Sequence, residues 1–255
     1  MEKNIRIRVS DTVHLAAVLH LPEQGTDRGV VICHGLLSDK DSQKHFQLAT
    51  KLCEAGIAAL RFDFQGRGQS PGDMMNISFS GQVKQAGAAI DALKNLACVK
   101  KIGISGSSMG GAVSILLAAK NPSVSCLVTM AAVARTDLLG ERIVGPKAME
   151  VWKRKGYLRF ENEPVGFSLV QDGKKVDVPG AARRIGCRWL IIHGQKDEVV
   201  PLEDAMLLRE SATCDPVLQV VAGADHSFSG DEHRQKVVNM AVDFFSGNLP
   251  ASVTE

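Results

Sequence analysis

Short, almost wholly apolar runs alternate with amphipathic helical segments along most of this 255-residue chain, and this alternation most constrains its fold. The runs are too short for helices, and their lack of polar alternation indicates strands that are buried on both faces. Buried strands that alternate with helices form a mostly parallel sheet with helices on both faces. The expected strands of this kind are residues 30–33, 57–62, 101–105, 124–130, 188–192 and 216–221.

The beginning of the chain has a different pattern. Apolar residues alternate with polar ones over residues 5–9 and, more loosely, over residues 13–21. The Ser-Asp-Thr segment at 10–12 separates the two runs, which predicts an antiparallel hairpin at an edge of the sheet. We therefore expect an α/β fold with an eight-stranded, mostly parallel sheet, in a single domain of residues 1–255.

Residues 135–180 interrupt the alternation, because they are charged and contain no recognisable buried strand. Within them, Asp172-Gly173 is flanked by Phe167–Val170 and Lys175–Val178, which predicts a β-hairpin. Long insertions in compact domains are more often functional lids than inert connections. We predict that residues 135–180 form a small inserted cap, and the alternative is a surface connection without a role.

The segment Gly106-Ser107-Ser108-Met109-Gly110 fits the pattern Gly-x-Ser-x-Gly. An expected strand precedes it and an expected helix follows it, which is the context that a nucleophile elbow requires. The flanking glycines allow a tight turn without Cβ clashes. We predict that Ser108 is a nucleophile, since neighbouring Ser107 is not centred between properly spaced glycines.

A serine hydroxyl is a weak nucleophile at neutral pH, and it needs a base and a group that orients the base. Asp197 and His226 follow the last two expected strands, in loops at the carboxyl ends where functional residues gather. We predict His226 as the base and Asp197 as the orienting acid. Asp225 and Glu198 are adjoining carboxylates that fit this role less well.

The first buried strand ends in His34-Gly35-Leu36. A loop at this position can supply one amide of an oxyanion hole, and the residue after the nucleophile supplies the other. The predicted donors are the N–H groups of Leu36 and Met109. His34 is expected to brace the loop rather than to take part in proton transfer.

Taken together, these motifs resemble those of α/β-hydrolases of the serine esterase type. The resemblance is to small bacterial carboxylesterases, including feruloyl and cinnamoyl esterases, with serine aminopeptidase-like and monoglyceride lipase-like groups as neighbours. At position 107 this chain has serine where many of those relatives carry histidine. The resemblance implies an acyl-enzyme mechanism without a metal or organic cofactor. It is carried by residues 31–35, 62–70, 106–110, 193–201 and 223–228.

We therefore predict a serine hydrolase that cleaves carboxylic esters of small to medium acyl or aryl substrates. Predicted substrate-binding residues come from the loop after the first buried strand and from the aromatic side chains of the cap. The six predicted residues are His34, Gly35, Trp152, Tyr157, Phe160 and Phe167. For the four cap aromatics, packing of the cap onto the core is an equally good interpretation.

Three other functions remain open on the sequence. A thioesterase would use the same three residues. An aminopeptidase-like hydrolase would need an acidic group under the cap, and the acids available there are Glu141, Glu150, Glu161 and Glu163. A non-catalytic binding protein would be expected to lack part of the motif set, and the set is intact here.

Composition argues against several other partners. Thirty Lys and Arg stand against 28 Asp and Glu, so no basic field for nucleic acid is expected. The six cysteines are scattered without metal-ligand spacing, and we expect reduced thiols and no metal site.

Residues 1–8 lack the apolar segment of a secretory signal, and the longest uncharged run is broken by Gly and Ser. We expect a cytoplasmic protein without a membrane span, and the sequence is compatible with a homodimer.

Overall fold

The computed structural model describes residues 1–160 and 163–250 and contains a sheet of eight strands in the order β1-β2-β4-β3-β5-β6-β9-β10. From β4 to β10 all neighbouring strands are parallel, whereas β2 pairs antiparallel with both β1 and β4. The predicted sheet and its edge hairpin are confirmed, but the expected burial is wrong for β10, because this strand lies at the edge of the sheet and Val217, Gln219 and Val220 are exposed. The strands are β1 (Glu2–Arg8), β2 (His14–His20), β3 (Arg28–Cys33), β4 (Ala58–Phe62), β5 (Lys101–Ser107), β6 (Val124–Met130), β9 (Arg188–Gly194) and β10 (Val217–Val221).

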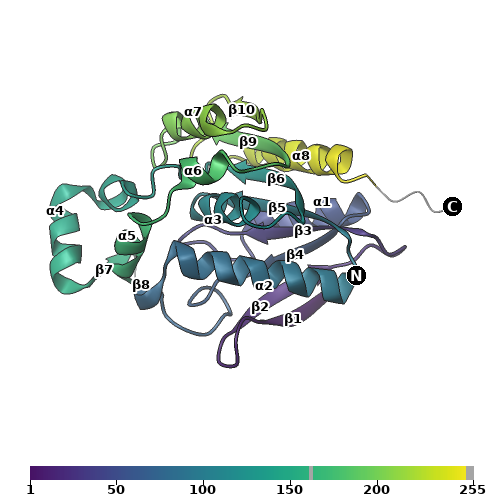
Figure 1. Ribbon diagram of the computed structural model, residues 1–255, viewed down its shortest axis with the longest axis horizontal. Coiled ribbons are helices and arrows are strands. Elements are labelled where there is room, and N and C mark those ends of the chain that lie inside the picture. Colours follow the sequence, from purple (N-terminus) through teal and green to yellow (C-terminus); the bar gives the residue numbers. More distant parts are fainter. Residues whose placement is uncertain (161–162, 251–255) are drawn as a thin grey trace.

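Helices cover both faces of the sheet, as the apolar strands require. Along β3, Val31 packs toward one face and Val30 toward the other, so the strand is buried on both sides. Helices α2 and α3 lie side by side on the Val31 face (Figure 1). The helices of the first face are α2 (Phe79–Ala97), α3 (Met109–Ala118), α6 (Val178–Ala182) and α7 (Leu202–Ser211), and those of the second are α1 (Gln43–Glu54) and α8 (Asp231–Asn248).

Most of the predicted cap, residues 135–180, gathers at one end of the molecule, away from the end of α8 (Figure 1). It contains α4 (Leu139–Lys155), an antiparallel hairpin of β7 (Tyr157–Phe160) and β8 (Glu163–Gly166), and α5 (Ser168–Gly173). Within the described residues, no helix is long and apolar enough to cross a membrane.

The hairpin predicted at Asp172-Gly173 is wrong, because these two residues end helix α5. Neither has the positive φ that a two-residue hairpin turn of this type needs. The Asp172 carboxylate instead accepts hydrogen bonds of 2.9 Å from the amide and hydroxyl of Ser80 at the start of α2. A Cβ on Gly173 would lie 2.7 Å from the carbonyl oxygen of Thr136. This glycine therefore serves close backbone packing rather than a turn.

Trp152 forms the centre of the cap's own packing. Its side chain is fully buried, and its ring makes edge contacts with the rings of Phe160 and Phe167 at centroid distances of 5.3 and 6.1 Å. The indole N–H donates to the carbonyl of Val165 at 2.9 Å, which satisfies the one polar atom of the side chain. These contacts hold α4 against the β7–β8 hairpin.

Asp204 of α7 ties the beginning of the cap to the core. Its buried carboxylate accepts the backbone N–H groups of Ala134 and Arg135 at 2.8 and 3.1 Å. It also forms an ion pair of 2.9 Å with Arg142 of α4. Because a buried carboxylate is costly unless its oxygens are satisfied, these three partners fix the entry of the chain into the cap.

Candidate active site

Ser108 occupies the turn between β5 and α3, with φ of 54° and ψ of −119°. This conformation is unfavourable for a residue with a side chain, and it persists only where the surrounding structure enforces it. A Cβ on Gly106 would lie 2.2 Å from the carbonyl oxygen of Gly110, and a Cβ on Gly110 would lie 2.4 Å from that of His34. The glycines of the motif are therefore required by the close approach of three backbone segments.

We expect Gly110→Ala to destabilise the protein by about 3 kcal/mol, because the added methyl group meets immovable backbone. Gly87→Ala in α2 is the matched control. Its added Cβ would find its nearest neighbour, Leu117 Cδ1, at 3.9 Å, so we expect a gain of about 0.5–1 kcal/mol from helix propensity. Urea denaturation measures both, and a Gly110→Ala protein as stable as wild type would contradict this account of the turn.

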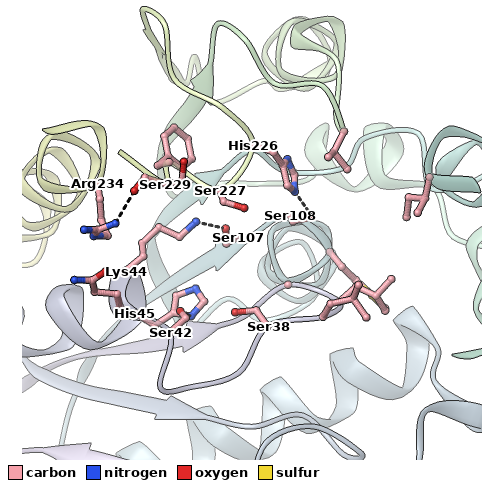
Figure 2. Close-up of a pocket in the computed structure, with 18 of the residues that line it drawn as sticks. Ser38, Ser42, Lys44, His45, Ser107, Ser108, His226, Ser227, Ser229 and Arg234 are labelled. Carbon is pink, nitrogen blue, oxygen red and sulfur yellow. Dashed lines mark hydrogen bonds between the residues drawn. The ribbon is translucent and has the colours of Figure 1, made fainter. Parts of the chain in front are cut away.

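The structure brings the three predicted catalytic side chains together at this turn. His226 Nε2 lies 3.0 Å from Ser108 Oγ, and His226 Nδ1 lies 2.8 and 3.0 Å from the two carboxylate oxygens of Asp197. A carboxylate can only accept, so the imidazole carries its proton on Nδ1. Nε2 is then free to accept the hydroxyl proton of Ser108. Figure 2 shows the contact between His226 and Ser108.

Asp197 is buried but well supplied with donors. Burial acts to raise the pKa of its carboxyl group, but the hydrogen bond from His226 and those from the amides of Val199 and Val200 outweigh burial and lower that pKa. His193 Nε2 lies 3.3 Å from the same carboxylate and 2.8 Å from the Val200 carbonyl. Asp197 is thus held ionised, as an orienting acid must be. Asp225, the adjoining carboxylate, accepts instead from Ser229.

Two backbone amides near Ser108 are free to donate. Within the described part of the chain, the N–H groups of Leu36 and Met109 have no hydrogen-bond partner, and both residues line the same cavity as Ser108. His34 braces the loop, because its Nε2 accepts from the amide of Phe64 at 3.0 Å and its Nδ1 donates to Gly35 O at 2.7 Å. Burial lowers the pKa of His34 to about 4, which keeps this neutral tautomer.

A cavity of about 510 Å³ opens beside Ser108, within the size range of small-molecule sites. The apolar side chains of the lining come mainly from the cap and from the loop after β3. The polar side chains come mainly from α1, the elbow and the loop before α8. The apolar side chains are Leu36, Leu37, Met109, Leu139, Ile143, Phe160, Val199 and Phe228, and the polar residues besides Ser108 and His226 are Ser38, Ser42, Gln43, Lys44, His45, Ser107, Ser227, Ser229 and Arg234.

Only two of the six predicted substrate-binding residues, Gly35 and Phe160, line this cavity. His34 lies behind the loop that it braces. Trp152 and Phe167 pack within the cap, and Tyr157 is 37% exposed on its surface. For Trp152 the packing interpretation is the better one, because a fully buried indole with its N–H satisfied has no face left for a ligand.

Lys44, in the first turn of α1, is a cavity residue that the sequence reasoning missed. Its ammonium donates to Ser107 Oγ at 2.8 Å, beside the predicted nucleophile (Figure 2). A signal was available: at helical spacing, Lys44 falls in the same buried stripe as Leu48 and Leu52. A lysine in an apolar stripe is rarely fully buried without a specific partner.

A family model described as "Serine aminopeptidase, S33" matches residues 24–177, more than half of the chain. The chain belongs to this family, which is one of α/β-hydrolases. The matched range includes Ser108 and ends before Asp197 and His226. Among curated proteins, a monoglyceride lipase homolog of Monkeypox virus is 25% identical over 224 residues, which is 77% of this chain and 80% of that protein.

Solved structures show the same fold. Est1E from Butyrivibrio proteoclasticus with ferulic acid bound superposes with a TM-score of 0.83 at 21% identity, covering 96% of this chain and 99% of that one. The esterase Pf2001 of Pyrococcus furiosus superposes with a TM-score of 0.77 at 20% identity, covering 98% and 93%. The α/β-hydrolase fold expected from the sequence is therefore confirmed across nearly the whole chain.

Proposed function

We propose that this protein is a serine hydrolase that cleaves carboxylic esters of small to medium acyl or aryl substrates through an acyl-enzyme intermediate. The observation that carries the proposal is the continuous hydrogen-bonded arrangement of Ser108, His226 and Asp197, in which Ser108 and His226 line a cavity. A nucleophile, a base and an orienting acid in this order are the components of triad catalysis.

In the proposed mechanism, Ser108 Oγ attacks the ester carbonyl carbon while His226 Nε2 takes the hydroxyl proton. Asp197 holds the imidazole in the useful tautomer and stabilises the imidazolium. The amides of Leu36 and Met109 donate to the oxyanion. His226 then protonates the leaving alcohol, and water repeats the sequence on the acyl-enzyme to release the acid.

The apolar part of the cavity supports an acyl or aryl group of limited size. Phe160 from β7 and Leu139 and Ile143 from α4 form its cap side, within the total of about 510 Å³. Est1E, which shares the fold, has a solved structure with ferulic acid bound, and this supports an aryl acyl group among the candidates. The esterase neighbour from Pyrococcus furiosus supports the same class of reaction.

The aminopeptidase alternative lacks support at the cavity wall. An amino-terminal ammonium would need a carboxylate there, and none of the described residues that line the cavity is acidic. Glu141, Glu150 and Glu163 are exposed on the cap surface, and Glu161 lies outside the described residues. A positively charged lining is the opposite of what this substrate class needs.

The test is hydrolysis of p-nitrophenyl esters from acetate to palmitate, with methyl ferulate alongside and Ser108→Ala as the blank. We expect activity that peaks at short to medium chains or on ferulate and is absent in the variant. Failure to hydrolyse any ester, while Ser108 still reacts with a fluorophosphonate, would overturn the ester proposal in favour of a thioester or peptide substrate.

A further inference from the structure

The polar side of the cavity contains an ammonium group that has no counter-ion. Lys44 is 9% exposed and lines the cavity, and no carboxylate of the described residues forms an ion pair with it. Its polar contact is the hydroxyl of Ser107, and its ammonium also lies 5.1 Å from the centre of the Phe228 ring. Buried charges in proteins are usually paired. The fold itself supplies no such partner for the Lys44 ammonium.

The surroundings of Lys44 favour an anion. Burial lowers the pKa of Lys44 to about 8, and Asp225 and Asp197 act against that shift from a distance, so the group is mostly charged at neutral pH. The first turn of α1 also lines the cavity, and the side chain of Ser42 does not cap it, which leaves its partial positive charge available.

Other charges on this side are already compensated. Arg234 forms an ion pair with Asp231, and its guanidinium also donates to the carbonyl of Ser229. Burial lowers the pKa of His45 to about 3, so this side chain is neutral. One uncompensated positive charge therefore remains, and it matches a single negative charge. In Figure 2 the side chains of Lys44, His45 and Arg234 all lie to the left of Ser108.

We propose that this side of the cavity is a carboxylate-binding subsite, in which Lys44 pairs with a carboxylate group carried by the ester substrate. The inference rests on the proposed ester hydrolysis and narrows its substrate class. The scissile ester lies at Ser108, its apolar side packs under the cap, and its other side ends in a carboxylate at Lys44. The carboxylate can belong to the acyl group or to the alcohol, and the experiment separates these two sources.

The competing explanation is structural: Lys44 would only hold the hydroxyl of Ser107 and thereby shape the elbow. In that case its removal would slow all esters alike, whatever their charge. A ratio of rates distinguishes the two explanations, because a loss common to charged and neutral esters cancels in it.

The experiment measures kcat/KM for two matched pairs of esters at neutral pH. Monoethyl glutarate against ethyl valerate places a carboxylate or a methyl group on the acyl side. The 3-carboxypropyl ester of butyric acid against butyl butyrate does the same on the alcohol side. The proteins are wild type, Lys44→Met, Lys44→Gln and Lys51→Met. Lys51→Met is the control for loss of a positive charge from α1, because the ammonium of Lys51 contacts Asn239 outside the cavity.

We expect wild type to prefer the charged ester of one pair by about 10-fold or more, and Lys44→Met to lower that ratio by about 10- to 100-fold. Lys44→Gln keeps an N–H donor at the end of the side chain but lacks the charge, so it should lower the ratio similarly. Lys51→Met should keep the wild-type ratio. Ratios near one in both pairs, or a ratio that Lys44→Met and Lys44→Gln leave unchanged, would overturn the subsite.

A binding measurement keeps the two proposals separable. Calorimetric titration of Ser108→Ala with monoethyl glutarate and with the 3-carboxypropyl ester needs no turnover, and adding Lys44→Met should weaken binding of one of them by about 10-fold or more. If wild type hydrolyses no ester but this difference in binding is present, the ester function fails and the subsite stands. Equal binding to both proteins, or none, overturns the subsite, and thermal melting shows whether the variants are folded.

Discussion

Ser108→Ala should lower kcat for a p-nitrophenyl ester by about 10⁶-fold, because the substitution removes the atom that would form the acyl-enzyme. The alanine leaves His226 and Asp197 without a nucleophile, and only the amides of Leu36 and Met109 and the cavity can still act on the ester. Binding and the oxyanion donors alone are worth about 10³- to 10⁴-fold over water, so a small residual rate is expected. Steady-state kinetics with extensively purified protein measures the loss.

Ser107→Ala is the matched control for Ser108→Ala. Its hydroxyl accepts from Lys44 rather than contacting His226, so this variant retains the predicted nucleophile. A loss of less than about 10²-fold in Ser108→Ala, or a larger loss in Ser107→Ala than in Ser108→Ala, would contradict the assignment of the nucleophile.

Asp197→Asn should lower kcat by about 10⁴-fold with little change of structure. The carboxylate oxygens now accept the Nδ1 proton of His226 at 2.8 and 3.0 Å. An amide in that place can present its NH₂ group, which stabilises the tautomer with the proton on Nε2. That tautomer cannot accept the proton of Ser108, and the imidazolium also loses its counter-ion. The measurement is kcat on the ester that wild type cleaves best.

Asp225→Asn tests whether the effect is specific. Asp225 adjoins His226 in sequence, but its carboxylate accepts from the amide of Ser229, so this variant should keep kcat within about tenfold of wild type on a neutral ester. Comparable losses in Asp197→Asn and Asp225→Asn would show that the orienting acid has been misassigned.

Much of the fold and of the catalytic arrangement could be predicted from the sequence, because the signals are local. The buried strands are continuous apolar runs, and the elbow needs two glycines within five residues. Gly106 and Gly110 are fixed by backbone contacts that any nucleophile elbow of this geometry makes. Asp197 and His226 each follow a strand directly, so the parallel sheet alone places them at the same edge.

The parts that were not predicted depend on contacts between distant segments. Asp172-Gly173 has the composition of a hairpin turn, yet Asp172 bonds Ser80, which is 92 positions away in the chain. The division of the cap aromatics between packing and the cavity likewise depends on how α4 meets the β7–β8 hairpin. The helical pattern places Lys44 in the buried stripe of α1, but the absence of a counter-ion, which gives the residue its significance, is a property of the packed structure.

Reaction with a fluorophosphonate, followed by intact mass and peptide mapping, reports an activated serine without any assumption about the substrate. The assignment of Ser108 as the nucleophile predicts one adduct per chain, located on Ser108, absent in Ser108→Ala and formed much more slowly in Asp197→Asn. An unmodified wild-type protein, or an adduct located on Ser107 instead, would contradict it.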